Sequence, residues 1–139
     1  MSKISGPLLD RIDIHVEVSS IDAERVVNGE VSESSAEIRK RVISARLFQV
    51  DRFKMAGIGV RTNAELTANH IREICKIPPT AELLLKAAIQ KLGLSVRAHD
   101  RILKLSRTIA DLEQSEEIRL EHVAEAIHLR GLDRESNAN

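Results

Sequence analysis

Residues 95–113 read SVRAHDRILKLSRTIADLE, and this stretch decides the fold class of the chain. Ser95 is one of the residue types that cap helix starts. Aliphatic side chains then recur at helical spacing, at Ile102, Leu105, Ile109 and Leu112. The pattern predicts a long helix from Ser95 to about Glu113, with these four side chains facing a core.

Four more helical segments are expected along the chain, at about residues 34–56, 67–75, 80–92 and 121–130. Ser34 and Glu37 have the spacing of a capping box at the start of the first. Thr80 is the expected cap after two prolines, Gly93 is expected to end that helix, and Gly131 to end the last. Because the connections are short, we expect an all-α fold, a small helical bundle.

The front of the chain carries a different pattern. Apolar side chains alternate with polar ones, which predicts a strand with one apolar face, at Ile12, Ile14, Val16 and Val18. No second strand of comparable quality follows, and a lone strand cannot pair its backbone or bury its face. We therefore interpret residues 1–30 as a poorly ordered remnant of an α/β core, residues 31–132 as the helical domain and residues 133–139 as a disordered tail.

Composition limits the function classes. Lys plus Arg and Asp plus Glu are equal at 21 each, so global steering toward DNA or a membrane is not indicated. Residues 37–54 are locally basic and residues 111–125 locally acidic, which fits either two solvated helix faces or complementary surfaces of neighbouring subunits. Phe48 and Phe53 are the only aromatics, which argues against a base-stacking platform.

A single cysteine, Cys75, excludes an intramolecular disulfide and is interpreted as a buried structural thiol. No signal peptide and no apolar run of membrane-spanning length is present, so a cytoplasmic location is expected.

Self-sufficient catalytic motifs are missing from the sequence. It contains no Gly-rich phosphate loop and no Gly-Lys-Ser/Thr. The histidines have no metal-ligand spacing and are interpreted as surface or helix-end residues: His15, His70, His99, His122 and His128. No metal ligand set is therefore predicted.

Arginine placement is the most informative functional signal. Arg97, Arg101 and Lys104 form one stripe on the helix of residues 95–113. Arg97 lies in the first turn, where a cation opposes the helix dipole at a cost of about 0.3–1 kcal/mol. Because guanidinium suits bidentate phosphate contact, Arg97 is a candidate phosphate ligand; the alternative is a solvated arginine or a surface ion pair. Arg11, at the entrance of the predicted strand, is a candidate catalytic arginine.

Four blocks of sequence, in this order, resemble the C-terminal part of the magnesium-chelatase-like AAA+ ATPases, in the ComM/YifB competence-protein branch. The blocks are SGPLLDRID at residues 5–13, ESSAEIR at residues 33–39, NAEL at residues 63–66, and LSVRAHDRILK continuing into RTIADLE at residues 94–113. The resemblance covers nearly the whole chain. Gln114 and Ser106 depart from the residues common in the family, glycine and alanine.

The resemblance implies that the chain is the end of an AAA+ core followed by its helical lid. Arg11 would be the arginine finger that acts in the neighbouring subunit, Arg97 the second-sensor arginine on the ATP phosphates, and Arg101 a weaker candidate for supporting that contact. ATP and Mg²⁺ would be bound by the full-length protein, with none expected on this chain alone. Without the phosphate loop, this chain alone is expected to be inactive as an ATPase.

The family further implies an oligomeric ring, a hexamer in the full-length protein, that remodels DNA by branch migration during natural transformation. Three alternatives stay open. The chain could belong to a chelatase motor subunit for magnesium insertion into porphyrin. It could instead be a helical DNA-binding module that uses its basic face, or a protein-interaction bundle without nucleotide dependence.

Overall fold

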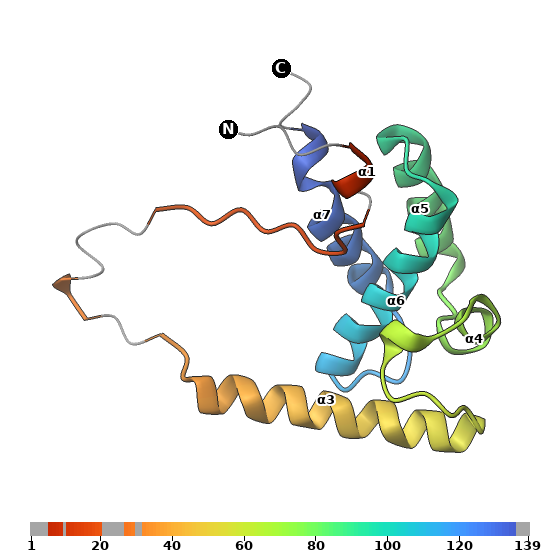
Figure 1. Ribbon diagram of the computed structural model, residues 1–139, viewed down its shortest axis with the longest axis horizontal. Helices are drawn as coiled ribbons and strands as arrows, with labels where there is room; N and C mark the ends of the chain where they lie inside the picture. The colour runs from red at the N-terminus through yellow and green to blue at the C-terminus, as the bar shows by residue number, and fades with distance from the viewer. Residues whose placement is uncertain (1–5, 10, 21–26, 30–31, 136–139) are drawn as a thin grey trace.

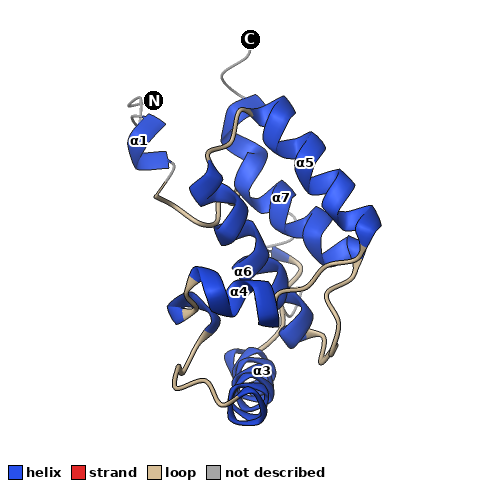
Figure 2. Ribbon diagram, turned by 90° about the vertical axis from the view of Figure 1, so that its right-hand side faces the viewer, coloured by secondary structure: helices blue, strands red, loops and turns tan. Residues whose placement is uncertain are grey.

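The computed structural model describes residues 6–9, 11–20, 27–29 and 32–135. Within these ranges every regular element is helical, as Figure 2 shows, so the predicted all-α bundle is confirmed. The elements are α1 (Gly6–Leu9), α3 (Ser35–Ala56), the 3₁₀ turn η1 (Asn63–Glu65), α4 (Ala68–Ile74), α5 (Pro79–Leu92), α6 (Val96–Leu112) and α7 (Leu120–Glu135).

Helix α6 is the centre of the bundle. It contacts α7, α3, η1 and α4, while α5 packs on α7. Figures 1 and 2 show α5, α6 and α7 side by side, with α3 crossing below them. The core is mainly aliphatic, and its most deeply buried members are Ala81, Ala98, Ile102, Ala110, Val123 and Ala126.

The predicted apolar face of α6 is largely confirmed. Ile102 and Ile109 are buried and Leu105 is half-buried. Leu112 is 43% exposed, so its core assignment is wrong. It is the last residue of the helix, after which the chain turns toward α7.

Helix starts follow the capping chemistry at most positions. The Ser34 hydroxyl accepts from the Glu37 N–H at 3.2 Å, and the Glu37 carboxylate accepts from the Ser34 N–H at 3.0 Å. Ser95 accepts from the N–H of Ala98 at 3.3 Å. The Thr80 cap is wrong, because α5 begins at Pro79, whose missing N–H and fixed φ suit the first helical position without a side-chain cap.

One of the two predicted glycine stops is confirmed. Gly93 ends α5 with φ 58°, in the left-handed region that favours glycine. Gly131 does not end α7, which continues to Glu135. A Cβ at Gly131 would lie 3.5 Å from Cδ1 of Leu92, an ordinary contact, so this glycine sits in the helix without being required by a turn.

Residues 11–20 have no regular secondary structure, so the strand predicted at Ile12 to Val18 is not formed. Their described backbone has no ladder partner, and the alternation leaves Ile14, Val16 and Val18 at 46%, 65% and 86% exposed. The segment is nevertheless attached to α7, because the His15 N–H donates to the Leu129 carbonyl at 2.7 Å. Ser5 and Asp10 of the first sequence block lie outside the described residues, and the division at residue 30 stays a prediction.

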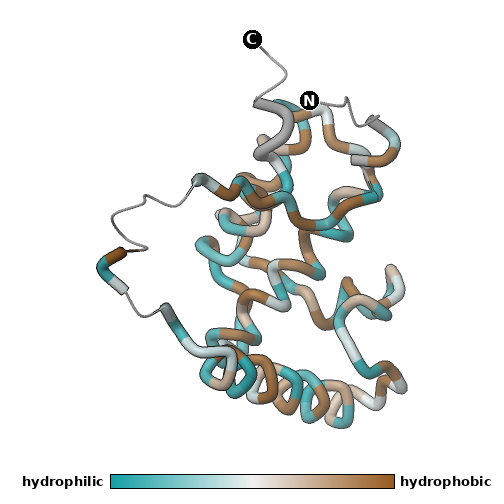
Figure 3. Tube along the Cα trace, turned by 60° about the vertical axis from the view of Figure 1, so that its left-hand side comes forward, coloured by the Kyte–Doolittle hydropathy of each residue, from teal (hydrophilic) through white to brown (hydrophobic). Residues whose placement is uncertain are grey.

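The second half of helix α3 packs against the rest of the bundle. Ala45, Gln49 and Phe53 are buried, whereas Val42 and Ile38, on the same face one and two turns before Ala45, are each 44% exposed. Figure 1 shows the start of α3 reaching beyond α6 and α7, and Figure 3 shows apolar and polar residues interleaved along it. The described part of the chain has no helix long and apolar enough to cross a membrane.

Candidate functional site

Arg11 lies directly after α1, in a turn where its backbone N–H donates to the Leu8 carbonyl at 3.0 Å. Its side chain is exposed. The guanidinium makes no hydrogen bond or ion pair with the residues that the structure describes. An anionic group outside this chain could therefore reach it without displacing a described partner.

Arg97 is the second residue of α6 and is also exposed. The ion pairs considered from the sequence, with Asp100 or Glu82, are not formed among the described residues; Asp100 instead lies 3.1 Å from Nδ1 of His99. The Arg97 guanidinium therefore opposes the dipole of α6 with no carboxylate in the described structure to compensate it.

Arg101 and Lys104, the other members of the predicted stripe, are engaged within the chain. Arg101 Nη1 lies 2.9 Å from Oδ1 of Asp13, and its side chain is 27% exposed. Lys104 Nζ donates to the Ala64 carbonyl at 2.9 Å and so holds η1 against α6. The stripe thus divides into one exposed arginine and two cations that bind other segments.

Asp13 is shared by two helices. Besides Arg101 of α6, Arg130 of α7 places its Nη1 3.5 Å from the same Asp13 oxygen. Arg130, whose side chain is 4% exposed, also donates to the Ile12 carbonyl at 3.0 Å. The segment that follows Arg11 is therefore bound to α7 and to α6, the helix that carries Arg97.

A buried polar network, consisting of Arg52, Asn63, Arg107 and Asp111, is the feature that sequence reasoning missed. Asp111 is fully buried and accepts from Nε of Arg107 at 3.0 Å and from the Asn63 amide at 2.8 Å, and it forms a two-point ion pair with Arg52. It ties α3 and η1 to α6. The sequence signal was the i, i+4 spacing of Arg107 and Asp111 within the RTIADLE block of α6.

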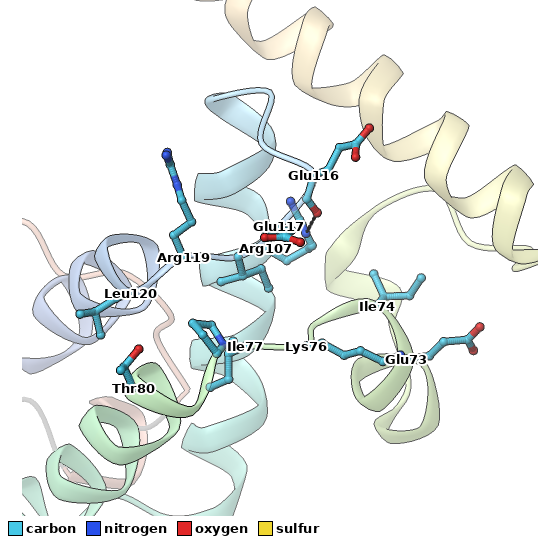
Figure 4. A pocket seen from close by; sticks show the side chains of 12 residues that line it. Glu73, Ile74, Lys76, Ile77, Thr80, Arg107, Glu116, Glu117, Arg119 and Leu120 are labelled. Atoms are coloured by element: carbon cyan, nitrogen blue, oxygen red, sulfur yellow. Dashed lines mark hydrogen bonds between the residues drawn. The ribbon is translucent and has the colours of Figure 1, made fainter.

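Arg107 extends this network to the loop before α7. Its Nη1 and Nη2 donate to the carbonyls of Glu116 and Ser115 at 2.8 and 2.5 Å. Burial lowers the pKa of the guanidinium, and the charge of Asp111 opposes that shift. Figure 4 shows Arg107 beside Glu116 and Glu117 in a groove of about 630 Å³ between α4, α5 and this loop. Because each of its guanidinium nitrogens already has a partner, we assign Arg107 a structural role.

Two histidines cap helix starts. His70 Nδ1 accepts from the Thr67 N–H at 3.3 Å, which closes a capping box on α4. His122 Nδ1 accepts from the Arg119 N–H at 2.9 Å, while Nε2 lies 2.9 Å from Oε2 of Glu113. His122 is fully buried, so a surface position is wrong and the helix-end interpretation is right.

The other sequence expectations concern Cys75 and metals. Cys75 is 3% exposed, and burial raises the pKa of its thiol to about 12, which confirms a buried structural cysteine. No group of three or more His, Cys, Asp or Glu side chains suited to a metal occurs within the described ranges.

A comparison with family models matches residues 32–130 to the family described as magnesium chelatase, subunit ChlI C-terminal. The match spans α3 to α7 and includes Arg97, the stripe and the buried polar network. Arg11 and Asp13 lie before its first residue.

Curated relatives extend the similarity over the front of the chain. The competence protein ComM of Haemophilus influenzae is 41% identical over 135 residues, which cover 96% of this chain and 25% of that protein. The YifB protein of Escherichia coli is 38% identical over 138 residues, covering 96% and 26%. The Mycobacterium bovis protein Mb2921c is 33% identical over 130 residues, covering 94% and 25%. The chain spans about a quarter of the length of these relatives.

Proposed function

The chain belongs to the magnesium chelatase, subunit ChlI C-terminal family, in the branch that contains ComM and YifB, and from this membership we propose how it acts. It is the helical lid of a chelatase-like AAA+ ATPase and supplies arginines to ATP hydrolysis in an oligomeric ring. The observation that carries the proposal is the state of Arg11 and Arg97. Both are exposed and have no described partner, whereas Arg52, Arg101 and Arg107 are all paired.

The two arginines act at different nucleotides. Arg97, at the start of α6, contacts the phosphates of the ATP bound to its own subunit. Arg11 reaches the γ-phosphate bound by the neighbouring subunit and stabilises the charge that develops during phosphoryl transfer. An arginine finger of this kind is worth about 10³–10⁵ in turnover.

The phosphate loop and the Mg²⁺ ligands belong to the rest of the parent protein, since this chain contains no Gly-Lys-Ser/Thr. ATP and Mg²⁺ are therefore cofactors of the assembled ring, which we propose is a hexamer, and this chain alone does not hydrolyse ATP. Because ComM of Haemophilus influenzae is a competence protein, we propose DNA as the substrate of the motor, remodelled by branch migration. Magnesium insertion into porphyrin is the alternative within the same family.

The test replaces each arginine in the full-length parent protein. Arg11→Ala should reduce ATP turnover by at least a hundredfold while nucleotide affinity stays within about threefold, because the finger contributes in the transition state. Arg97→Ala should weaken nucleotide binding as well as turnover. Arg61→Ala is the matched control, an exposed arginine remote from α6 in sequence and without a described ion pair. If Arg11→Ala hydrolyses ATP normally, the finger assignment is wrong.

Mixed rings separate action within a subunit from action across an interface. Arg11→Ala subunits should recover activity when combined with subunits that carry a defective phosphate loop, because intact sites then form at half of the mixed junctions. Arg97→Ala should not be rescued by the same partner, since the second sensor and the phosphate loop serve the same site.

A second candidate function rests on the surface of α3. Ile43 and Leu47 are 52% and 60% exposed beside Arg39, Lys40 and Arg46, so α3 offers a mixed apolar and basic face. Such a face suits DNA phosphates or an acidic protein surface without any need for nucleotide. The discriminating measurement is a DNA mobility shift with this chain alone. Binding that weakens steeply with salt and is indifferent to ATP supports DNA binding by α3, and absence of a shift removes DNA as its partner.

A further inference from the structure

Asp13 has no role in the function proposed above. It follows Arg11 by two residues, and one of its carboxylate oxygens lies 2.9 Å from Nη1 of Arg101 and 3.5 Å from Nη1 of Arg130. The side chain is 62% exposed and sits on the outside of the bundle. A surface carboxylate shared by arginines of two helices is a joint between three segments.

The joint connects the surroundings of both proposed functional arginines. Arg101 follows Arg97 by four residues on α6, one turn or about 6 Å along the axis. On the other side, two residues of extended chain from Asp13 to Arg11 span at most about 7 Å. The ion pair therefore joins the first turns of α6 to the segment that carries Arg11.

Two further contacts involve the backbone of this segment. Arg130 donates to the Ile12 carbonyl at 3.0 Å, and the His15 N–H donates to the Leu129 carbonyl at 2.7 Å. Both contacts go to α7. Among these contacts, the ion pair between Asp13 and Arg101 is the one that joins the segment to α6, the helix of Arg97.

We propose that Asp13 is a positioning residue that couples Arg11 to α6, so that occupancy of one nucleotide site sets the position of the finger at the next. The inference rests on the proposed function. Arg97 moves α6 when it binds phosphate, and Arg101, one turn later, carries Asp13 with it. Asp13 places Arg11 and touches no reacting atom.

The experiment compares Asp13→Asn with Glu17→Gln in the full-length parent protein. Glu17 lies in the same extended segment, is exposed and has no described ion pair, so the control removes an identical charge without touching the joint. Asp13→Asn should lower kcat by at least tenfold with KM within about twofold, because misplacing a catalytic group acts on the transition state. Asp13→Glu, which keeps the charge, should recover most of kcat. Glu17→Gln should match the unsubstituted protein.

A second readout follows the joint itself. Hydrogen exchange of the His15 amide, whose N–H is bonded to Leu129, should speed up at least tenfold in Asp13→Asn, while exchange within α6 is unchanged. Loss of protection throughout α6 would mean a structural role and would overturn the coupling. Faster exchange at His15 together with an unchanged kcat would overturn it as well.

The two proposals fail in different ways. If Arg11→Ala retains turnover, the proposed function is wrong and the coupling is wrong with it. If Arg11→Ala abolishes turnover but Asp13→Asn equals Glu17→Gln, the finger assignment is retained and the coupling alone is wrong. If Asp13→Asn raises KM and leaves kcat unchanged, the effect is on nucleotide binding and the coupling is again wrong.

Discussion

Replacing Asp111 by Asn tests the buried polar network, and its consequence can be worked from the contacts. Asp111 is fully buried and neutralises Arg107, whose side chain is 2% exposed, and Arg52, whose side chain is 16% exposed. The Asn variant keeps the shape but leaves two guanidinium groups without a carboxylate. Removing one partner of a buried pair costs about 3–5 kcal/mol, because an uncompensated charge stays buried. That is a large share of the roughly 5–15 kcal/mol by which domains are stable.

The assay is urea unfolding followed by far-ultraviolet circular dichroism, since the chain has no Trp or Tyr to report by fluorescence. At an m-value of about 2 kcal/mol/M, the midpoint should fall by about 2 M. Arg52→Met should cost less than Asp111→Asn, because Arg52 is partly exposed and its removal leaves the Arg107 pair intact. The matched control is Asp51→Asn on the exposed side of α3. If Asp111→Asn unfolds at the same urea concentration as this control, the network does not stabilise the fold and the argument is refuted.

Three further predictions concern single contacts. The pKa of Glu113 is lowered, chiefly by its hydrogen bond to His122. The stability that this bond contributes is therefore present above the unfolded pKa near 4.3 and is lost as the pH falls through the lower folded pKa. His122→Gln should flatten the decrease of the urea midpoint below pH 5. Burial raises the pKa of Cys75 to about 12, so a thiol reagent at pH 8 should react only on unfolding, and rapid labelling of the native chain would contradict the burial. Gly93→Ala should lower the free energy of unfolding by about 1 kcal/mol, because φ at this residue is 58°. Gly131→Ala, inside α7 with room for a Cβ, should raise the free energy of unfolding by about 0.5–1 kcal/mol. Equal shifts of the thermal midpoint in the two variants would refute the distinction.

Features set by neighbouring residues could be predicted from the sequence. The capping box of Ser34, the Ser95 cap and the left-handed Gly93 each depend on a few adjacent positions, and each is present. The helical period of α6 gave its buried face as far as Ile109. Local chemistry was misleading where two signals competed: Pro79 replaced Thr80 as the start of α5, and the packing of α7 outweighed the weak helix propensity of Gly131.

Features set by distant residues could not be predicted in the same way. Asp111 is bonded to Arg52 and Asn63, 59 and 48 residues earlier, and neither spacing leaves a period in the sequence. His122 is buried because Glu113 and the Arg119 N–H satisfy both ring nitrogens, which only the fold of the intervening turn makes possible. At the candidate site, the sequence selected Arg97, Arg101 and Lys104 together. Their different partners became apparent only when Asp13 and Ala64 were placed beside them.

The half-supported helix α3 has a mechanical consequence. The helix is packed against the bundle as far as Ala45, and Ser35 is 10 residues beyond it, or about 15 Å along the axis. A tilt of about 10° at Ala45 therefore moves the far tip by about 3 Å. The capping box stabilises the first turn of this unsupported part. Small rearrangements around Asp111 are thus amplified at the exposed start of α3, where Ile38 and Val42 would present them to a neighbouring surface.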